Sequence, residues 1–438
     1  MMITAKGHSD PTIGLLRIER WLGQQLFKSI GLPPIRFVLK DGTEISPAGS
    51  SLIGAVFVHD YRTLAKLIID PEMAFGEAYA EGRVHVNGDL VQLLEAVYQS
   101  MGAAPEGRFA RLTSKWMNWW QANTLRGSRN NIHSHYDLGN EFYKLWLDPQ
   151  MIYTCAYFAS PQVTIEEAQQ AKLDYICRKL ELRPGETVVE AGCGWGALAL
   201  HMAQHYGVTV KAFNISHEQI LFARRAAVER RLSSQVEFIE DDYRNIPGGF
   251  DAFVSVGMLE HVDPKYFSDF GEVIYRAVGD TGRGLLHFIG RSYTGNFSRW
   301  IRKRIFPGAH APSLAEAMNI LQPRHYSVLD VENLRPHYAR TLEHWLDRFE
   351  ASSPQVIEMY GPWFQRAWRL YLAGSIAGFR AGTLQLFQIT FAGAKRHSRS
   401  WTRAPLYHKP GYREMAQCGF DSLSLKAAGA RRASEINV

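Results

Sequence analysis

Long hydrophobic runs are missing from this sequence. Among its 438 residues, no stretch of about 18 consecutive apolar residues occurs, which excludes an ordinary membrane-spanning helix. The segment from Met1 to Pro11 has no basic region followed by an apolar one, so it does not resemble a secretory signal peptide. We therefore expect a soluble protein of the cytoplasm.

Cysteine is scarce, and its spacing does not indicate metal binding. The four cysteines are Cys155, Cys177, Cys193 and Cys418, and they form no C-x-x-C pair and no His/Cys cluster with zinc spacing. A disulfide scaffold and a structural zinc site are therefore not expected. We predict free thiols and no bound metal.

A strong overall charge is also lacking, since the formal net charge is only +6. The segment from Phe391 to the end contains nine Lys or Arg and three Asp or Glu, which accounts for the whole surplus. Basic tails of this kind are usually solvated and mobile. We predict a basic, flexible tail over residues 394–438.

What the sequence does contain is a glycine-rich turn directly after a β-branched run. The run begins at Thr187 and ends at Glu190, and Gly192, Gly194 and Gly196 follow. Alternating glycines allow a tight turn between a strand and a helix, and they let the backbone approach a ligand closely. The pattern predicts a nucleotide or nucleoside site with the Glu190 carboxylate at its edge.

The position of this acid separates two classes of cofactor. A dinucleotide fold places an acid at the end of the next strand, where it binds the ribose. Here the acid precedes the glycines, and the next strand, Val208 to Phe213, is followed by the uncharged Asn214. A cationic ligand without phosphates suits this arrangement, and S-adenosylmethionine is such a ligand.

Residues 131–391 alternate between apolar strands and helices, which predicts a parallel sheet covered on both faces. The expected strands start near residues 187, 208, 236, 250, 284 and 326, and a last, antiparallel strand runs from Leu384 to Phe391. This ending fits a methyltransferase better than a dehydrogenase. We predict an α/β fold for residues 131–393: a class I S-adenosylmethionine-dependent methyltransferase, Rossmann-like, with a seven-stranded doubly wound sheet.

The chain before this fold divides into two parts. Residues 1–100 predict a small N-terminal α+β domain without a catalytic constellation, so an accessory or docking role is expected. The connector at 101–130 combines tryptophans with basic residues. This composition is typical of membrane interfaces and equally of helices that join domains, and the sequence favours neither.

Polar side chains follow the other strands of the predicted sheet, at the edge where open α/β sheets bind ligands. They are Asn214 and Gln219 after the second strand, Asp242 and Tyr243 after the third, Glu260 and His261 after the fourth, and His287 and Ile289 on the fifth. Asp242 is placed to accept a hydrogen bond from an adenine amino group, with a turn cap as the alternative. Glu260, His261 and His287 supply acid/base groups near the sulfonium.

Six stretches resemble motifs of the cyclopropane fatty acid synthase family. They are Asn131–Asn140, Tyr153–Phe158, Ala168–Leu173, Glu190–Gly196, Gly257–Val262 and Leu286–Gly290, and they occur in the order that the family shows. The N-terminal unit also resembles that of the bacterial, two-domain members. Six ordered motifs are far more specific than one glycine loop.

The resemblance implies transfer of a methylene group from S-adenosylmethionine to the cis double bond of an acyl chain in a membrane phospholipid. It also implies two sets of site residues. Bicarbonate would be held by Cys155, Glu260, His287, Tyr338 and a backbone group beside Ile289. The cofactor would be contacted by Tyr153, Thr154, the loop of Glu190, Gly192, Gly194 and Gly196, and by Asn214, Gln219, Asp242 and Tyr243.

The implied reaction explains this equipment. An alkene is a weak nucleophile, so the enzyme must align it with the methyl group rather than deprotonate it. Aromatic faces stabilise the resulting carbocation, exclusion of water protects it, and bicarbonate is the base that allows ring closure. Cys155 is then an ion ligand and not a nucleophile, and Ser375 stands where some members carry a cysteine.

Two alternatives stay open at this point. Methyl transfer without ring closure would make the protein a fatty-acyl C-methyltransferase that yields methyl-branched or methylene-bearing chains. A lipid-binding scaffold without turnover is the other reading, and the presence of Cys155, Glu260, His287 and Tyr338 speaks against it.

The segment from Phe297 to Phe306 contains four basic residues together with Trp300, Ile301 and Ile305. On a helix it would set cations at lipid headgroups, where each contributes about 1 kcal/mol near an anionic surface. No nucleic-acid-binding module accompanies it, so lipid is favoured over nucleic acid as the partner. We expect peripheral association with the inner face of the membrane, and the resemblance suggests a homodimer.

Overall fold

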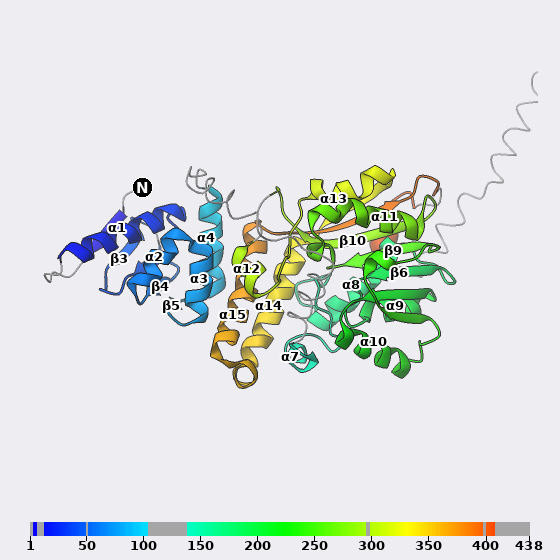
Figure 1. The fold of residues 1–438 in the computed structure, drawn as a ribbon, viewed down its shortest axis with the longest axis horizontal. Coiled ribbons are helices and arrows are strands. Elements are labelled where there is room, and N and C mark those ends of the chain that lie inside the picture. The colour runs from blue at the N-terminus through cyan, green and yellow to red at the C-terminus, as the bar shows by residue number, and fades with distance from the viewer. Residues whose placement is uncertain are drawn as a thin grey trace, which may run out of the picture.

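The computed structural model describes residues 3–6, 13–49, 51–103, 138–294, 298–396 and 400–407. They form a five-stranded sheet in an N-terminal unit and a seven-stranded sheet in a C-terminal unit. Helices α14 (Arg335–Ala351) and α15 (Ser353–Ala381) stand between the two sheets (Figure 1). The predicted connector beyond residue 103, residues 131–137 of the first motif, Phe297 and most of the basic tail lie outside the described residues.

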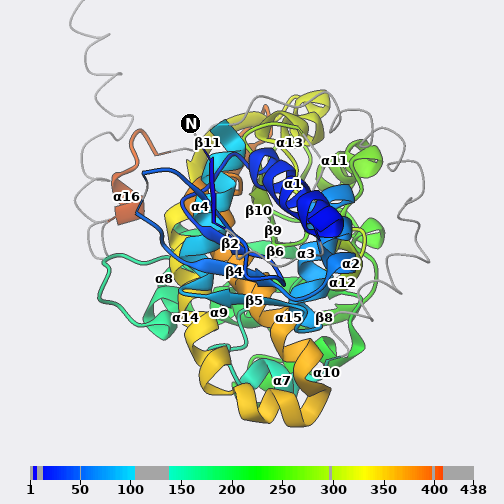
Figure 2. The same cartoon turned by 90° about the vertical axis from the view of Figure 1, so that its left-hand side faces the viewer.

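The N-terminal unit has the predicted α+β architecture. Its strands are β1 (Ile3–Lys6), β2 (Arg36–Val38), β3 (Glu44–Pro47), β4 (Ala55–Val58) and β5 (Val84–Asn87), in the order β1-β3-β2-β4-β5. Its helices are α1 (Ile13–Ser29), α2 (Tyr61–Ile69), α3 (Pro71–Ala80) and α4 (Leu90–Ala103), and Figure 2 looks onto this unit. Apolar side chains of both layers, among them Leu26, Phe37, Val56 and Leu93, form its core.

The C-terminal unit contains the predicted doubly wound sheet. Its strands are β6 (Thr187–Ala191), β7 (Thr209–Asn214), β8 (Val236–Glu240), β9 (Ala252–Val256), β10 (Arg283–Gly290), β11 (Ser327–Asn333) and β12 (Gln385–Ala392). The order is β11-β12-β10-β9-β6-β7-β8, with β6 to β10 parallel. β12 is antiparallel, as predicted, and it is paired on both sides, so β11 forms the edge.

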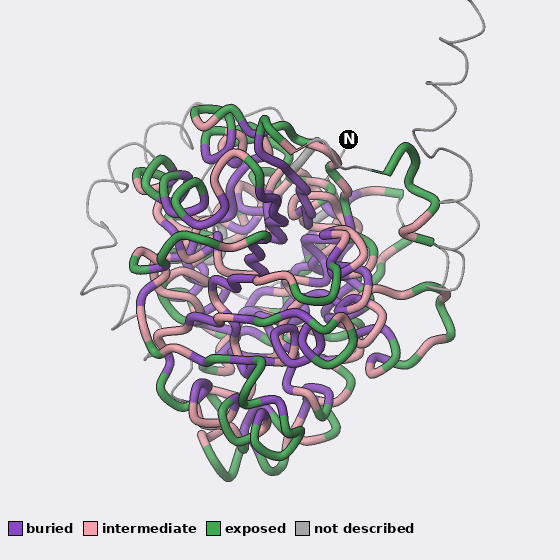
Figure 3. The backbone as a smooth tube through the Cα atoms, turned by 90° about the vertical axis from the view of Figure 1, so that its right-hand side faces the viewer, coloured by how far each residue is buried: buried purple, intermediate pink, exposed green. Residues whose placement is uncertain are grey.

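Helices cover both faces of this sheet. The remaining helices of the unit are α7 (Asn140–Lys144), α8 (Ile165–Lys179), α9 (Ala197–Tyr206), α10 (His217–Glu229), α11 (Phe267–Val278), α12 (Arg299–Arg304), α13 (Leu314–Leu321) and α16 (Ala404–Tyr407). Successive strand residues point to opposite faces. Val188 and Val254 therefore pack with α8, α9 and α10, whereas Val189 and Phe253 pack with α11 and α13. The buried strands at the centre of Figure 3 are the result.

Local sequence signals explain where the helices that carry site residues begin and end. Thr164 and Glu167 form a capping box at the start of α8, which satisfies backbone N–H groups that would otherwise be free. Gly361, with φ of +81°, and Pro362 produce a kink within α15. Among the described residues, no helix has both the length and the hydrophobicity needed to cross a bilayer.

Helix α15 connects the two units. It lies against α14 on one side and against α3 and α4 of the N-terminal unit on the other. Arg369 of α15 donates a hydrogen bond of 2.7 Å from Nη1 to the hydroxyl of Tyr79 in α3. The N-terminal unit is therefore packed directly against the helix that borders the candidate active site.

Helix α12 contacts the N-terminal unit through two of its four basic residues. Arg299 forms an ion pair of 2.7 Å with Asp70, and Arg304 forms one of 2.6 Å with Glu77. Trp300 is only 3% exposed and packs against α3. Burial keeps Trp300 from contact with lipid, and the two ion pairs fasten the units together. A role of the basic residues at lipid headgroups stays a prediction.

Candidate active site

A small cavity of about 130 Å³ lies at the carboxyl ends of β6 and β7. Seven of the predicted cofactor residues line it, namely Tyr153, Thr154, Glu190, Gly192, Gly194, Asn214 and Gln219. The structure therefore brings together the loop before α8, the glycine turn and the end of β7, as expected for an open α/β sheet.

Glycine is required at two positions of the turn for different structural reasons. A Cβ at Gly194 would meet no atom within 4 Å, so the backbone there borders open space in the cavity. A Cβ at Gly196 would lie 2.6 Å from the ring of Phe238, so this glycine allows α9 to pack closely on the sheet. Gly196 does not line the cavity, and its contribution is to position the turn.

Glu190 ends β6 as a buried carboxylate, 2% exposed. Burial raises the pKa of Glu190 to about 8, against the opposing charge of Lys172 on α8. Its Oε2 atom is buried and has no hydrogen-bond partner. A buried carboxylate oxygen without a partner is costly, which indicates that a ligand donor completes the site.

Lys172 is a second buried charge at this cavity. Its Nζ donates a hydrogen bond of 2.9 Å to Oγ1 of Thr154, and burial lowers the pKa of Lys172 to about 8. The lysine thereby holds the loop that carries Thr154 and Cys155. Lysine is rarely buried in a protein core unless it is paired. Lys172 lies within the motif Ala168–Leu173, but it was not among the predicted site residues.

The predicted ribose and adenine residues behave differently from one another. Asn214 donates 2.7 Å to Oε1 of Gln219, so both amides face the cavity as a pair. Asp242 instead accepts hydrogen bonds from the backbone and side chain of Arg244, and Tyr243 packs edge-on against Phe270. Asp242 and Tyr243 line neither cavity, and their contact with adenine stays a prediction.

A second, much larger cavity of about 750 Å³ begins where the small one ends. The two cavities share Tyr153, Thr154, Gly257 and His261 as lining residues. Most of the larger cavity is apolar, and it extends past α15 into the N-terminal unit. The four shared residues, which we call the transfer wall, therefore lie between the small cavity, which is lined by Glu190 and Lys172, and a hydrocarbon-lined one.

Glu260 and Ile289 meet beside the transfer wall. Oε1 of Glu260 accepts a hydrogen bond of 2.5 Å from the backbone N–H of Ile289, and Oε2 is buried without a partner. Burial raises the pKa of Glu260 to about 7. The carboxyl group is therefore able to carry a proton near neutrality, when it can donate a hydrogen bond to an anion.

His287 is fixed by a buried chain of hydrogen bonds that the sequence did not reveal. Lys179 donates 2.8 Å to Oε1 of Gln388, which turns the Gln388 amide nitrogen toward Nδ1 of His287 at 2.9 Å. Burial holds the pKa of His287 well below its usual range, so the ring is neutral. With Nδ1 accepting, the proton is on Nε2, which is buried and has no partner.

The other predicted ion ligands are Tyr338 and Cys155. Tyr338, on α14, lines the large cavity and packs on Phe379 at 4.8 Å between ring centroids. Cys155 is fully buried, lines neither cavity and donates from Sγ to its neighbour's carbonyl at 3.2 Å. Burial raises the pKa of Cys155, so it is a thiol and not a thiolate nucleophile. Its contact with an ion stays a prediction.

Several site residues were missed because no local signal marks them. Gln388 and Lys179 become neighbours of His287 only through the pairing of β12 with β10 and the packing of α8. Tyr371 on α15 bonds the hydroxyl of Tyr153 at 2.9 Å across more than two hundred residues of chain. The position of Tyr371 on α15 gives no sign of which aromatic residues of that helix face the site.

The family model described as mycolic acid cyclopropane synthetase matches residues 123–389. A second model, described only as a domain of unknown function, matches residues 23–106. A probable fatty acid methyltransferase of Pseudomonas putida is 32% identical over 392 residues, which cover 85% of this chain and 96% of the relative. The cyclopropane-fatty-acyl-phospholipid synthase of Escherichia coli K12 is 41% identical over 259 residues, covering 59% and 66%.

Solved structures agree with these relatives. The mycolic acid cyclopropane synthase CmaA1, solved in complex with SAH and CTAB, is 29% identical with a TM-score of 0.57. The match covers 60% of this chain and 97% of that one. The chain therefore belongs to the mycolic acid cyclopropane synthetase family, and it is an enzyme with the fold of S-adenosylmethionine-dependent methyltransferases.

Proposed function

We propose that this enzyme transfers a methylene group from S-adenosylmethionine to the cis double bond of unsaturated acyl chains in membrane phospholipids, and so forms cyclopropane chains. The observation that carries this proposal is the transfer wall, at which a small cavity with charged and amide groups in its lining meets a large apolar one. A sulfonium ligand on one side and an alkene on the other would be neighbours across Tyr153, Thr154, Gly257 and His261.

The small cavity fits the donor. S-adenosylmethionine, when bound, supplies the activated methyl group. Oε2 of Glu190 lacks a partner, the space over Gly194 is open, and Asn214 and Gln219 offer amide groups nearby. These residues would hold the cationic part and the ribose, and Lys172 keeps Thr154 in place beside them.

Two unpartnered buried atoms suit a small anion beside the transfer wall. They are Oε2 of Glu260 and Nε2 of His287, and each is able to present a proton to an acceptor. Bicarbonate, when bound, supplies a base for the proton that must leave before ring closure. We propose that Glu260 and His287 hold it, with Cys155, Tyr338 and the backbone beside Ile289 as further candidate contacts.

An aromatic cluster lies at the transfer wall, and two of its rings, Tyr153 and Tyr338, line the large cavity. Trp146, Tyr153 and Trp345 contact one another with ring centroids 5.2 to 5.6 Å apart, and Tyr338 lies 6.0 Å from Trp345. Ring faces stabilise a cation on the substrate, and a dry surrounding prevents its capture by water. The same rings therefore favour a carbocation on the substrate and keep water from capturing it.

A fatty-acyl C-methyltransferase without ring closure is the second candidate, and the Pseudomonas relative named a probable fatty acid methyltransferase favours it. The experiment incubates the purified full chain with donor carrying a deuterated methyl group, bicarbonate and vesicles of unsaturated phospholipid. Mass spectrometry and chromatography of the released fatty acids then separate the products. A ring retains the new carbon with one deuterium lost, whereas a methyl branch retains all of them; unchanged lipid rejects both candidates.

We also propose that the enzyme works as a peripheral protein on the inner face of the membrane, since its substrate chain lies in the bilayer. Flotation with anionic and neutral vesicles tests this, and a protein that stays with the aqueous fraction in both cases contradicts it. The homodimer stays a prediction that light scattering of the full chain tests.

A further inference from the structure

The hydrophobic interior of the N-terminal unit is hollow. Its end of the 750 Å³ cavity is lined by hydrocarbon side chains, including Leu26, Ile30, Phe37, Val56, Leu93 and Val97. These residues belong to the core cluster of the unit or pack against it. Protein interiors are normally close packed, and an apolar void destabilises the fold when nothing fills it. The void therefore indicates a hydrophobic ligand.

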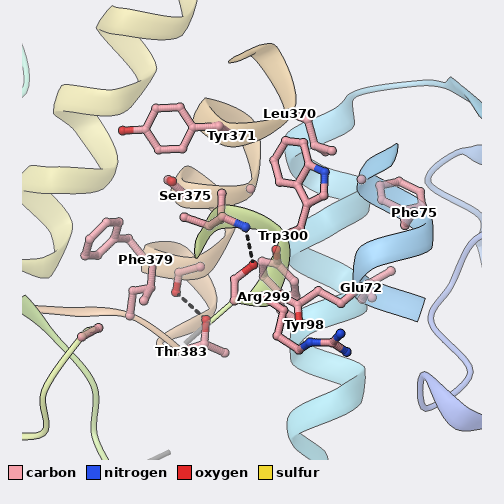
Figure 4. Close-up of a pocket in the computed structure, with 18 of the residues that line it drawn as sticks. Glu72, Phe75, Tyr98, Arg299, Trp300, Leu370, Tyr371, Ser375, Phe379 and Thr383 are labelled. Atoms are coloured by element: carbon pink, nitrogen blue, oxygen red, sulfur yellow. Dashed lines mark hydrogen bonds between the residues drawn. The ribbon is translucent and has the colours of Figure 1, made fainter. Parts of the chain in front are cut away.

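The void is continuous with the transfer wall along one face of α15. Gly374, Ser375 and Gly378 line the cavity there, and their small side chains leave a passage. Figure 4 shows Ser375 and Phe379 of α15 on one side of this passage, with Phe75 of the N-terminal unit on the other and Trp300 between them. A chain that leaves the transfer wall can therefore enter the N-terminal unit without crossing water.

We propose that the interior of the N-terminal unit receives the methyl-terminal half of the acyl chain whose double bond is modified. This inference rests on the proposed function and extends it to a site in the other unit. A double bond lies within its chain, so both halves must leave the transfer wall. The half that carries the headgroup must reach water, whereas the methyl half needs a closed, apolar end.

The lining of the cavity distinguishes these two directions. Charged and polar groups, among them Glu72, Tyr98, Arg291, Tyr293 and Arg299, also line the cavity, and Tyr293 is 60% exposed. Arg291 and Tyr293 suit the end of the lipid that meets solvent. The core residues of the N-terminal unit, among them Leu26, Phe37 and Val56, offer hydrocarbon contacts, which suit a methyl terminus. The N-terminal unit thereby limits how long the methyl side of a substrate chain can be.

The first test narrows the hollow with Val97→Trp, which adds volume to its wall without touching the transfer wall. The substrates are phospholipid vesicles whose unsaturated chains share one double-bond position and differ in the length of the methyl side. We expect kcat/KM to fall about tenfold or more for the longest methyl side, and the loss to shrink as that side shortens. An equal loss for all chains overturns the inference. Ile69→Trp is the matched control, since Ile69 is 81% exposed in the same unit.

A second series keeps the unsaturated chain constant and varies the saturated chain beside it on the glycerol. We expect Val97→Trp to show no dependence on that chain. If the loss follows the saturated chain instead, the hollow holds the neighbouring chain and the inference is wrong. Ile30→Trp, from another element of the same wall, should reproduce the pattern if Val97→Trp fails to fold.

Binding is measured separately from turnover with a phospholipid that carries a diazirine at the methyl end of its unsaturated chain. After irradiation of the full chain, we expect labelled peptides from β2, β4 and α4, and less labelling in Val97→Trp. Labels confined to the C-terminal unit overturn the inference. Labelling of the N-terminal unit without any turnover by the unaltered enzyme rejects the proposed reaction and leaves the lipid site standing.

Discussion

The carboxylate of Glu260 is anchored by the backbone N–H of Ile289 at 2.5 Å. The anchor uses Oε1 alone, and Oε2 is left buried and without a partner. One oxygen therefore fixes the side chain, and the other is held still beside the transfer wall. We therefore expect an amide in the same place to preserve the structure and to remove the proton transfer that the carboxyl group allows.

Glu260→Gln should lose turnover with little effect on folding. The amide oxygen still accepts from Ile289, but the amide N–H₂ can only donate to an anion beside it and can neither take up nor release a proton. We expect kcat/KM for unsaturated vesicles to fall by about a hundredfold or more. Glu272→Gln, at a 60% exposed side chain paired with Arg324, is the matched control and should keep full activity. Full turnover by Glu260→Gln would remove Glu260 from the ion site.

The contribution of two buried glutamates to stability should fall as the pH rises, because both resist ionisation. Burial raises the pKa of Glu260 to about 7 and that of Glu190 to about 8, whereas glutamate in an unfolded chain titrates at about 4.3. Between these values the unfolded chain binds fewer protons than the folded protein, so the free energy of unfolding decreases with pH.

Urea unfolding between about pH 5 and pH 8 measures this dependence for each glutamate. Glu260→Gln removes one of the two, so its stability relative to the unaltered enzyme should rise across the window by at most about 3 kcal/mol. Glu272→Gln should run parallel to the unaltered enzyme. A parallel profile for Glu260→Gln as well would show that this carboxyl group ionises normally in the folded state.

Gln388→Glu should change the tautomer of His287. A carboxylate accepts from Nδ1, so the proton would move there and Nε2 would become an acceptor, which no longer suits an anion. We expect a loss of turnover of about tenfold to a hundredfold, the range found when groups that orient a site histidine are changed. The ¹⁵N shifts of the His287 ring report the tautomer directly. Gln385→Glu introduces a carboxylate at another buried position of β12, and a matching loss there would assign the effect to buried charge alone.

Alanine at the two glycines should separate binding from folding. At Gly194 the new methyl group enters the open space of the small cavity, so binding of S-adenosylhomocysteine should weaken by about tenfold while the fold loses only about 1 kcal/mol. At Gly196 it would meet Phe238, so unfolding should become easier by roughly 2–4 kcal/mol. Calorimetric titration and thermal unfolding check both, and the same result at both positions would contradict the distinction.

The fold of the C-terminal unit was predictable because its signals are local. Apolar strands bounded by glycine or asparagine, such as the one from Thr187 to Glu190, and helices between them fix a parallel sheet. The carboxyl ends of these strands then place Glu190, Asn214 and Glu260 at one edge, which the structure confirms. The place of β12 inside the sheet was not visible, since strand order depends on pairing between residues that are distant in the sequence, such as Arg283 with Ala392.

The parts of the site that the sequence did not predict arise from packing between distant elements. Gln388 acts on His287 only because β12 pairs with β10, and Tyr371 reaches Tyr153 only because α15 crosses the cleft. The acids that pair with Arg299 and Arg304 of α12 were not predictable for the same reason, as composition gives a charge but not the acid that faces it. The hollow in the N-terminal unit likewise depends on how its elements pack, and no residue type in the sequence predicts it.

Arg369 and Tyr371 stand two positions apart on α15, where the first bonds Tyr79 of the N-terminal unit and the second bonds Tyr153 at the transfer wall. A single helix is thus hydrogen-bonded to both units of the molecule. A chimaera that exchanges the N-terminal unit between relatives should therefore exchange α15 as well. Otherwise the foreign N-terminal unit would displace α15, and the displaced helix would misalign the methyl group with the substrate.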